Sequence, residues 1–183
     1  MVIIRKATSQ DKKAIIELHR NVARISQGIA RTEPEITEQY VDGLFRTIEN
    51  QGLMLVAVSA ANQVVAEIHA SKYGLQIFDH ILTGLTIAVH PDYQGKGIGK
   101  MLFQSFLEEV QRTFPEVGRV ELESRASNQK SIGLYHSLGF VQEGRMKNKT
   151  RNVDGSFEHS LLMAWTKPGF GYNQVSGPNA VAD

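Results

Sequence analysis

One stretch decides how this chain folds: residues 87–100 read Ile87-Ala88-Val89-His90-Pro91-Asp92-Tyr93-Gln94-Gly95-Lys96-Gly97-Ile98-Gly99-Lys100. An apolar strand stops at Pro91, a glycine-rich turn follows, and helical periodicity runs from about Gly99 to Phe114. Such a turn gathers free backbone N–H groups at a helix N-terminus, where the helix dipole also favours an anion. Glycine is needed because side chains would keep the backbone from wrapping closely around a phosphate. The stretch therefore predicts a phosphate-binding turn between a strand and a helix.

Two common phosphate-binding patterns do not fit this turn. A Walker A loop needs glycine where the chain has Gln94, and Ser or Thr where it has Met101. The dinucleotide pattern Gly-x-Gly-x-x-Gly needs its last glycine at Lys100 or at Leu102, depending on where the count starts. A nucleotide-binding protein is therefore disfavoured.

A third pattern, Gln/Arg-x-x-Gly-x-Gly/Ala after a Val-x-Pro strand end, fits at every position. With it the chain resembles the GNAT superfamily of N-acetyltransferases, and the resemblance extends from Val2 to Met163. The resemblance implies that acetyl-CoA is the acetyl donor and that the turn binds its pyrophosphate. The implied cofactor-binding residues are Ile87, Ala88 and Val89 for the pantetheine arm, then Gln94, Gly95, Lys96, Gly97, Ile98, Gly99 and Lys100 for the phosphates.

A second block supports the resemblance. Residues 121–128 contain Glu-x-Arg-Ala-Ser-Asn, and residues 134–140 read Leu-Tyr-x-x-Leu-Gly-Phe. Within the superfamily, this block is similar to bacterial enzymes that acetylate the N-terminal alanine of a ribosomal protein. The resemblance implies that Glu123 is the general base and that Tyr135 is the general acid that protonates the departing thiolate. Asn128 lies two helical turns before Tyr135, so both residues face one side and Asn128 also joins the predicted cofactor site.

The identity of the base has alternatives. Glu121 and Glu123 share one face of a strand, and Glu121 is expected to be solvated. Some members of the superfamily carry a catalytic glutamate on the fourth strand, where this chain has Thr83-Gly84-Leu85-Thr86. Glu67 on the third strand is the reserve candidate. His69 faces the same way as Glu67 and is a candidate to line the acceptor pocket, although an exposed strand histidine is the simpler expectation.

Periodicity predicts an α/β (α+β) protein with a mixed, mostly antiparallel central sheet of six to seven strands and about four flanking helices. Residues 1–166 are predicted to form one acetyltransferase domain. Residues 167–183, rich in Gly, Pro and Asn, form a tail without periodicity. The strands are expected at residues 2–4, 53–58, 64–71, 81–90, 119–124, from 140, and at 157–165; the helices are expected after Thr8, at 37–50, at 99–114 and at 128–137.

Composition excludes several other classes of protein. The 183 residues contain 20 Lys and Arg against 19 Asp and Glu, too little basic excess for a general nucleic-acid or membrane-surface binder. Cysteine is absent, and the six histidines form no His-x-x-x-His pair, so no metal site is expected. No apolar run is long enough for a signal peptide or a membrane span. A cytoplasmic monomer or homodimer is expected.

The acceptor amine is the least determined feature. In the superfamily it is held by the loop between the first two helices and by the final hairpin, here residues 26–35 and 147–156. Deprotonation at pH 7 costs about 1.4 kcal/mol for an α-amine of pKa near 8 and about 5 kcal/mol for a lysine of pKa near 10.4. A peptide or protein N-terminus is therefore the first prediction. A small-molecule amine is the alternative, and a non-catalytic acyl-CoA-binding regulatory module is a further one.

Overall fold

The structure is a computed structural model, and it describes residues 2–25 and 28–172. Within these residues the chain forms seven strands and four α-helices, and every predicted element is present with its ends shifted by a few residues. In chain order they are β1 (Val2–Lys6), α1 (Lys12–Ala23), α2 (Glu38–Gln51), β2 (Gly52–Ser59), β3 (Val64–Lys72), β4 (Ile81–Val89), α3 (Ile98–Thr113), β5 (Arg119–Arg125), α4 (Gln129–Ser137), β6 (Val141–Arg151) and β7 (Phe157–Thr166).

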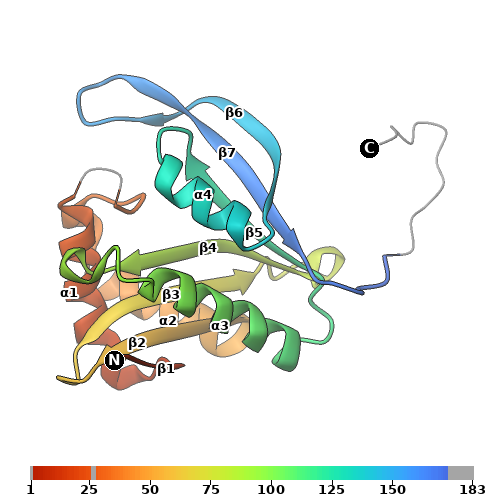
Figure 1. The fold of residues 1–183 in the computed structure, drawn as a ribbon, viewed down its shortest axis with the longest axis horizontal. Coiled ribbons are helices and arrows are strands. Elements are labelled where there is room, and N and C mark those ends of the chain that lie inside the picture. Colours follow the sequence, from red (N-terminus) through yellow and green to blue (C-terminus); the bar gives the residue numbers. More distant parts are fainter. Residues whose placement is uncertain (1, 26–27, 173–183) are drawn as a thin grey trace.

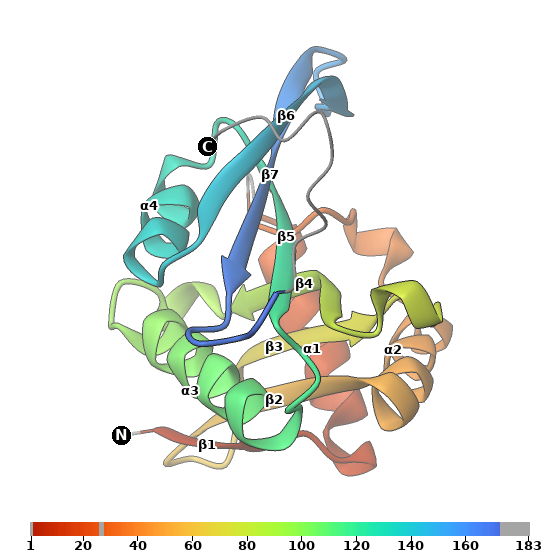
Figure 2. The same ribbon diagram turned by 90° about the vertical axis from the view of Figure 1, so that its right-hand side faces the viewer.

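The strands form a single sheet in the order β1-β2-β3-β4-β5-β7-β6. Among the described residues, β4 and β5 are the one parallel pair, and every other neighbouring pair is antiparallel. Helices α1 and α2 cover one face of the sheet, whereas α3 and α4 cover the other (Figures 1 and 2). The predicted fold class, a mixed and mostly antiparallel sheet with flanking helices, is confirmed.

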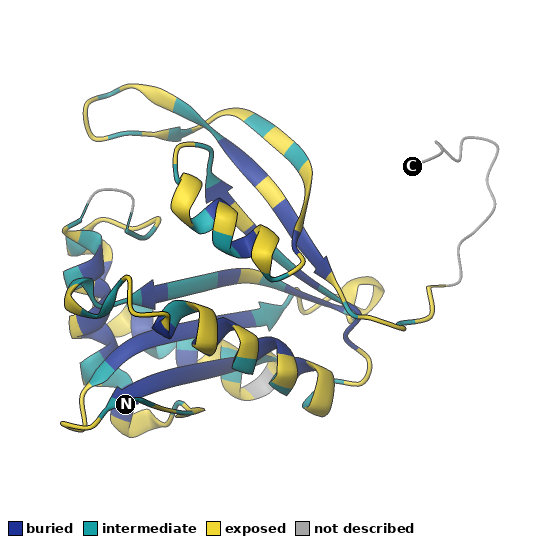
Figure 3. Ribbon diagram, in the orientation of Figure 1, coloured by how far each residue is buried: buried dark blue, intermediate teal, exposed yellow. Residues whose placement is uncertain are grey.

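Strand β2 shows why the sheet is buried on both faces. Its residues Leu53, Leu55 and Ala57 pack with α3, whereas the alternate residues Met54 and Val56 pack with α1 and α2. Side chains alternate between the faces of a strand, so a continuous apolar run is what a doubly covered strand needs. The burial is visible along β2 and β3 in Figure 3.

A bulge in β4 shapes the centre of the molecule. His69 in β3 pairs with Thr86, but Ser71, two residues on, pairs with Thr83, so β4 contains one extra residue. Gly84 supplies it with a φ of +64°, a backbone conformation that residues with a Cβ rarely adopt. The bulge lies next to the place where β4 stops pairing with β5.

Strands β4 and β5 pair only at Ile81 with Arg119 and at Leu82 with Val120. Beyond this point β4 stays beside β3, while β5 continues beside β7, and the two strands diverge in Figure 1. Among the described residues, the outer edge of β4 from Thr83 to Val89 therefore has no strand partner.

The first residues of the predicted tail are attached to the domain. The Lys167 N–H donates to the Gly118 carbonyl at 2.8 Å, and the Phe170 ring covers Gly118 so closely that an added Cβ would lie 2.4 Å from it. Residues 173–183 of the predicted tail lie outside the described residues.

Asp11 connects β1 to the start of α1. Its buried carboxylate accepts hydrogen bonds from the Arg5 guanidinium at 2.7 and 2.8 Å and from the Thr8 N–H at 2.8 Å. Thr8 is the N-cap residue of a 3-10 turn, Ser9–Asp11, that leads into the helix expected after it. The hydrogen bonds from Arg5 lower the pKa of Asp11 from its ordinary value of 3.8, against the opposing effect of burial.

We expect Asp11→Asn to destabilise the protein by about 1–3 kcal/mol at pH 7, because a charge-assisted hydrogen-bond network is lost. A carboxylate with a lowered pKa stabilises the fold above its ordinary value of 3.8, and this contribution disappears as the pH falls through the lowered value. Urea unfolding at several pH values should therefore show a gap between the two proteins that closes only in acid. Asp42→Asn, which removes an exposed pair with Lys12, is the control and should change stability little. A gap that is constant down to the lowest pH would contradict this account.

Candidate active site at the end of strand β4

The glycine-rich turn has the geometry expected from its sequence. Strand β4 ends at Val89, a 3-10 turn covers Pro91–Tyr93, and Gly97 caps the N-terminus of α3. Gly95 and Gly97 have φ values of +74° and +78°, in the left-handed region. An added Cβ would meet no atom within 4 Å at either position, so backbone conformation rather than crowding requires glycine there.

The turn presents a row of unsatisfied donors. In the part of the chain that the structure describes, the backbone N–H groups of residues 95–100 have no acceptor. The turn is held from behind, because Gln94 Nε2 donates to the Val89 carbonyl at 3.0 Å and Lys96 Nζ donates to the Asp92 carbonyl at 2.7 Å. A fixed row of N–H groups at the positive end of a 16-residue helix favours a multiply charged anion.

The unpaired edge of β4 adjoins this turn. The His90 N–H donates to the Val65 carbonyl of β3 at 2.9 Å. Backbone groups alternate in direction along a strand, so those of Ile87 and Val89 face away from β3, towards the edge that β5 has left. The Ala88 side chain is instead buried against α1, where it packs on Leu18 and Val22. The edge can therefore accept an extended ligand that carries amide groups.

Helix α4 brings Tyr135 to the face that α3 covers. The Tyr135 ring is buried between Phe103 of α3 and Phe140, with ring centroids 5.8 and 6.1 Å away. Burial raises the pKa of Tyr135, and an interaction with the Ser131 side chain opposes this only in part. The phenol is therefore protonated at neutral pH and able to donate. Asn128 caps the helix by accepting the Ser131 N–H at 3.2 Å.

Glu123 lies on the opposite face of the sheet from Tyr135. Its neighbours Val120 and Leu122 belong to the core under α3, so Glu121 and Glu123 point to the α1 and α2 side. The Glu123 carboxylate is 38% exposed and lies 3.0 Å from Lys149 Nζ of β6. Glu121, which was expected to be solvated, instead forms an ion pair with Arg119 Nε at 2.6 Å and accepts a hydrogen bond from the Tyr73 hydroxyl at 2.9 Å.

A buried polar cluster lies on the same side as Glu123. Glu67 has no exposed surface, and its two oxygens contact His19 Nε2 at 2.9 Å and His69 Nδ1 at 2.8 Å. Burial raises the pKa of Glu67, but the charges and hydrogen bonds of the two histidines outweigh it and lower that pKa to about 2. Glu67 is therefore an ionised carboxylate that cannot itself contact an amine.

Sequence reasoning misplaced one histidine of this cluster and missed another. The expectation of an exposed His69 is wrong, because α1 and α2 cover this part of β3 and leave its side chain 8% exposed. His19 was not recognised as part of the site, and it is completely buried. A signal was present, since His19 follows Ile15 by four residues and so lies on the apolar face of α1.

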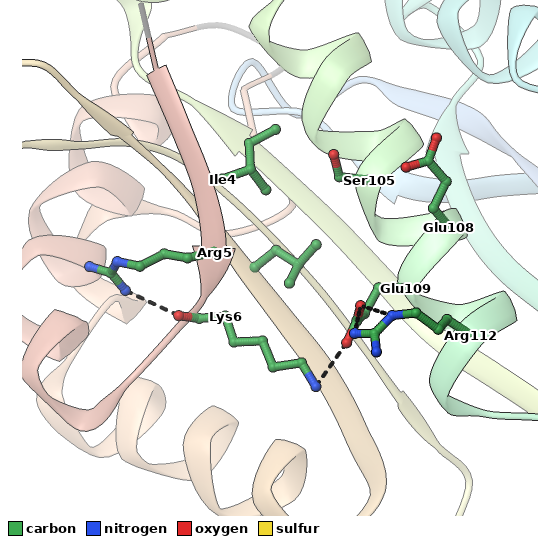
Figure 4. Close-up of a pocket in the computed structure, with 8 residues that line it drawn as sticks. Ile4, Arg5, Lys6, Ser105, Glu108, Glu109 and Arg112 are labelled. Carbon is green, nitrogen blue, oxygen red and sulfur yellow. Dashed lines mark hydrogen bonds and ion pairs between the residues drawn. The ribbon is translucent and has the colours of Figure 1, made fainter.

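A groove of about 400 Å³ between β1 and α3 lies away from these residues. Figure 4 shows Lys6 and Arg112 converging on Glu109, with Lys6 Nζ 2.9 Å from the carboxylate. The Glu109 carboxylate is thus paired with both cations, which gives the charged side chains of this groove a structural role. In the described ranges, no group of three or more His, Cys, Asp or Glu side chains is arranged to hold a metal ion. No described helix has the length and apolarity needed to cross a membrane.

Fold and turn together define an α/β protein that presents peptide N–H groups to an anionic ligand beside an open strand edge. The model of the acetyltransferase (GNAT) family matches residues 18–140, and the chain belongs to this family.

Known proteins resemble the chain to different extents. The [ribosomal protein bS18]-alanine N-acetyltransferase of Escherichia coli K12 is 39% identical over 82 residues, which are 45% of this chain and 53% of that protein. The chain thus spans about half the length of this relative. The L-amino acid N-acyltransferase MnaT of the same organism is 39% identical over 149 residues, 78% of this chain and 81% of MnaT. The structure of yncA from Salmonella typhimurium with its cofactor acetyl-CoA covers 99% of both chains with a TM-score of 0.80 and 20% identity, and supports the fold alone.

Proposed function

We propose that the protein is an N-acetyltransferase that moves the acetyl group of acetyl-CoA directly to a primary α-amine. The observation that carries the proposal is the row of free N–H groups at residues 95–100 beside the open edge of β4, in a chain of the GNAT family. The pyrophosphate of acetyl-CoA is a double anion, and its pantetheine arm is an extended chain with two amides. These two parts match the turn and the strand edge respectively.

The proposed binding mode uses backbone groups first. The N–H groups from Gly95 to Lys100 hold the phosphates, and the backbone of Ile87 and Val89 pairs with the arm as an added strand would. Gln94 keeps the turn close to Val89, and Asn128 faces the arm from α4. A β4 N–H group between Leu85 and Val89 then polarises the thioester carbonyl.

The proposed chemistry divides between the two faces of the sheet. The neutral amine attacks the thioester carbon, a tetrahedral intermediate forms, and the carbon–sulfur bond breaks as Tyr135 protonates the sulfur of CoA. Two protons leave the amine nitrogen during the reaction, one before the attack and one after it. Glu123 accepts a proton through a water molecule, since it is exposed and contacts Lys149 of the predicted acceptor hairpin 147–156.

Relatives support an α-amine as the acceptor. One is an N-acetyltransferase of the alanine of a ribosomal protein, and MnaT is an N-acyltransferase of L-amino acids. The first candidate acceptor is the N-terminus of a peptide or protein. A free amino acid is the second candidate, favoured by Arg31, whose exposed guanidinium lies 4.1 Å from the ring centre of Tyr40 and can pair with a carboxylate. Arg31 belongs to the predicted acceptor loop 26–35, of which residues 26 and 27 lie outside the described residues.

Several further statements stay predictions. They are the division into a domain of residues 1–166 and a tail of residues 167–183, a cytoplasmic location, a monomeric or homodimeric state, and partners that include neither nucleic acid nor membrane.

The function is tested by release of free thiol from acetyl-CoA with a panel of peptides, amino acids, polyamines and aminoglycosides. We expect turnover with α-amines, and peptides before free amino acids. Turnover with amino acids but not peptides would favour the second candidate. Tight binding of acetyl-CoA without turnover of any amine would overturn the proposal and favour a regulatory acyl-CoA-binding module.

Tyr135→Phe should lower kcat by about 100-fold, because the proton donor for the thiolate is lost. Acetyl-CoA affinity should change little, since the phenylalanine ring keeps the packing on Phe103 and Phe140. Tyr73→Phe is the matched control, as it removes a phenol outside the proposed site and should keep the wild-type rate. Steady-state kinetics with calorimetric acetyl-CoA binding measures both effects, and an unchanged kcat would remove Tyr135 from the chemistry.

Glu123→Gln should reduce activity mainly at low pH, because a growing fraction of the acceptor amine is already neutral as the pH rises. Glu121→Gln is the control from the same face of β5; its carboxylate is occupied by Arg119 and Tyr73, so the pH dependence should stay that of the wild type. The measurement is kcat/KM for the acceptor across the accessible pH range. A Glu123→Gln profile that matches the wild type would reject Glu123 as a proton acceptor.

A further inference from the structure

The cluster of His19, Glu67 and His69 has no part in the chemistry described so far, although it is the one described group in which a buried carboxylate joins two histidines. We propose that His69 accepts a proton through Nε2 from the ammonium group of the acceptor, and that Glu67 and His19 hold it in the state that can do so. This inference rests on the proposed function and adds the group that prepares the amine for attack.

Hydrogen bonding determines which nitrogen of His69 is available. An ionised carboxylate only accepts, so His69 Nδ1 must carry a hydrogen and donate it to Glu67 Oε1 at 2.8 Å. The lone pair of the neutral ring then lies on Nε2. Among the described residues Nε2 has no hydrogen-bond partner, and the His69 side chain keeps 8% of its surface exposed, whereas His19 and Glu67 have none. His69 thus carries the unpaired nitrogen and is the one member of the three with any exposed surface.

The other histidine is excluded from taking the proton. His19 Nε2 donates to Glu67 Oε2 at 2.9 Å, and its Nδ1 is completely buried without a partner in the described residues. Protonation of His19 would place a buried N–H on Nδ1 with no acceptor, which is costly. Glu67 Oε1 therefore faces Nδ1 of His69, where it stabilises an imidazolium, while the contact of His19 with Oε2 orients the carboxylate.

His69 lies close to the proposed reaction centre. It is directly opposite Thr86 of β4, and opposite side chains on neighbouring strands have Cβ atoms about 4.5–5.5 Å apart. Thr86 belongs to the segment of β4 that has lost β5, where the thioester is proposed to lie. The bulge residue Gly84 beside it has no side chain, and an added Cβ there would meet nothing within 4 Å. The bulge therefore adds no side chain to this stretch of β4.

The cluster also connects to the acceptor loop. The Tyr40 ring of α2 lies 6.0 Å from His19, and Arg31 of the loop lies over Tyr40 at 4.1 Å. The groups in contact with His69 are thus Glu67 from its own strand and His19 from α1, whose ring centroid lies 6.4 Å away, and Tyr40 and Arg31 connect to the cluster through His19. An acceptor held at Arg31 and Tyr40 enters on the same side of the sheet as His69.

The proposed step balances as a proton transfer. The ammonium group of the acceptor gives one proton to His69 Nε2 and becomes a neutral amine, and the imidazolium is stabilised by Glu67 through the Nδ1 hydrogen bond. The amine then attacks, and the second proton leaves the nitrogen through water to Glu123 on the opposite diverging strand. His69 then returns its proton to water through Nε2.

The test is His69→Ala, assayed with the acceptor that the amine panel identifies. We expect kcat to fall by about 100-fold with acetyl-CoA affinity within twofold of wild type, and added imidazole to restore part of the rate. A purely structural role would not give rescue by a diffusible base. His69→Gln, which fills more of the space, provides a second folded variant and should show the same loss of rate. His80→Ala, a histidine outside the cluster, should keep the wild-type rate.

The variant Glu67→Gln tests whether Glu67 acts only by positioning His69. It should lower kcat in the wild-type background but add little in the His69→Ala background, because its effect acts through His69. The inference would be overturned if both His69 variants kept the wild-type rate. It would also be overturned if imidazole did not rescue His69→Ala and the losses of rate in the double variant were additive. Failure of the wild-type protein to acetylate any amine would instead overturn the proposed function, so the two failures are distinguishable.

Discussion

Beyond Leu82, strand β4 has a paired strand on one side only among the described residues, and the proposed site follows from this. Backbone N–H and C=O groups need partners, and β5 satisfies those of β4 for two residues before it turns away to pair with β7. The Gly84 bulge allows β4 to change its twist at this point. The open edge then offers hydrogen bonds to a ligand with peptide-like groups, and the turn at its end favours an anion. Acetyl-CoA combines both in one molecule.

The sheet separates the two halves of the proposed reaction. Tyr135 lies with α3 and α4 on one face, where the leaving sulfur is protonated. Glu123 and His69 lie on the other face, with α1, α2 and the acceptor loop. Because β4 and β5 diverge between these faces, an acetyl group held at the β4 edge is accessible from both. The proton donor Tyr135 is therefore separated by the sheet from the proton acceptors Glu123 and His69, so the donor cannot pass its proton directly to either acceptor.

The protein stabilises negative charge with hydrogen-bond donors at fixed positions. The chain has 20 basic and 19 acidic side chains, which leaves no basic excess for a polyanion. Backbone N–H groups supply the positive end instead, at fixed positions and without charged side chains. Glu67 is the opposite case, a fully buried carboxylate that persists because two histidines donate to it. Cysteine is absent, so the one thiol in the proposed reaction belongs to CoA.

The sequence by itself determined the features that depend on near neighbours. Gly95 and Gly97 specify a left-handed turn, the continuous apolar run of β2 specifies a doubly covered strand, and the spacing of Asn128 and Tyr135 places one at the N-cap of α4 and the other within that helix. Tertiary structure alone decided the contacts of the charged groups. His19 and Glu67 are 48 residues apart, and Glu123 and Lys149 are 26 apart. The periodicity of the sequence predicts which face of a strand or helix a residue occupies. Which element covers that face depends on the order of the strands in the sheet and on the point at which β4 and β5 diverge. Glu67 is therefore a buried anchor rather than a base, and His69 is the group left open beside it.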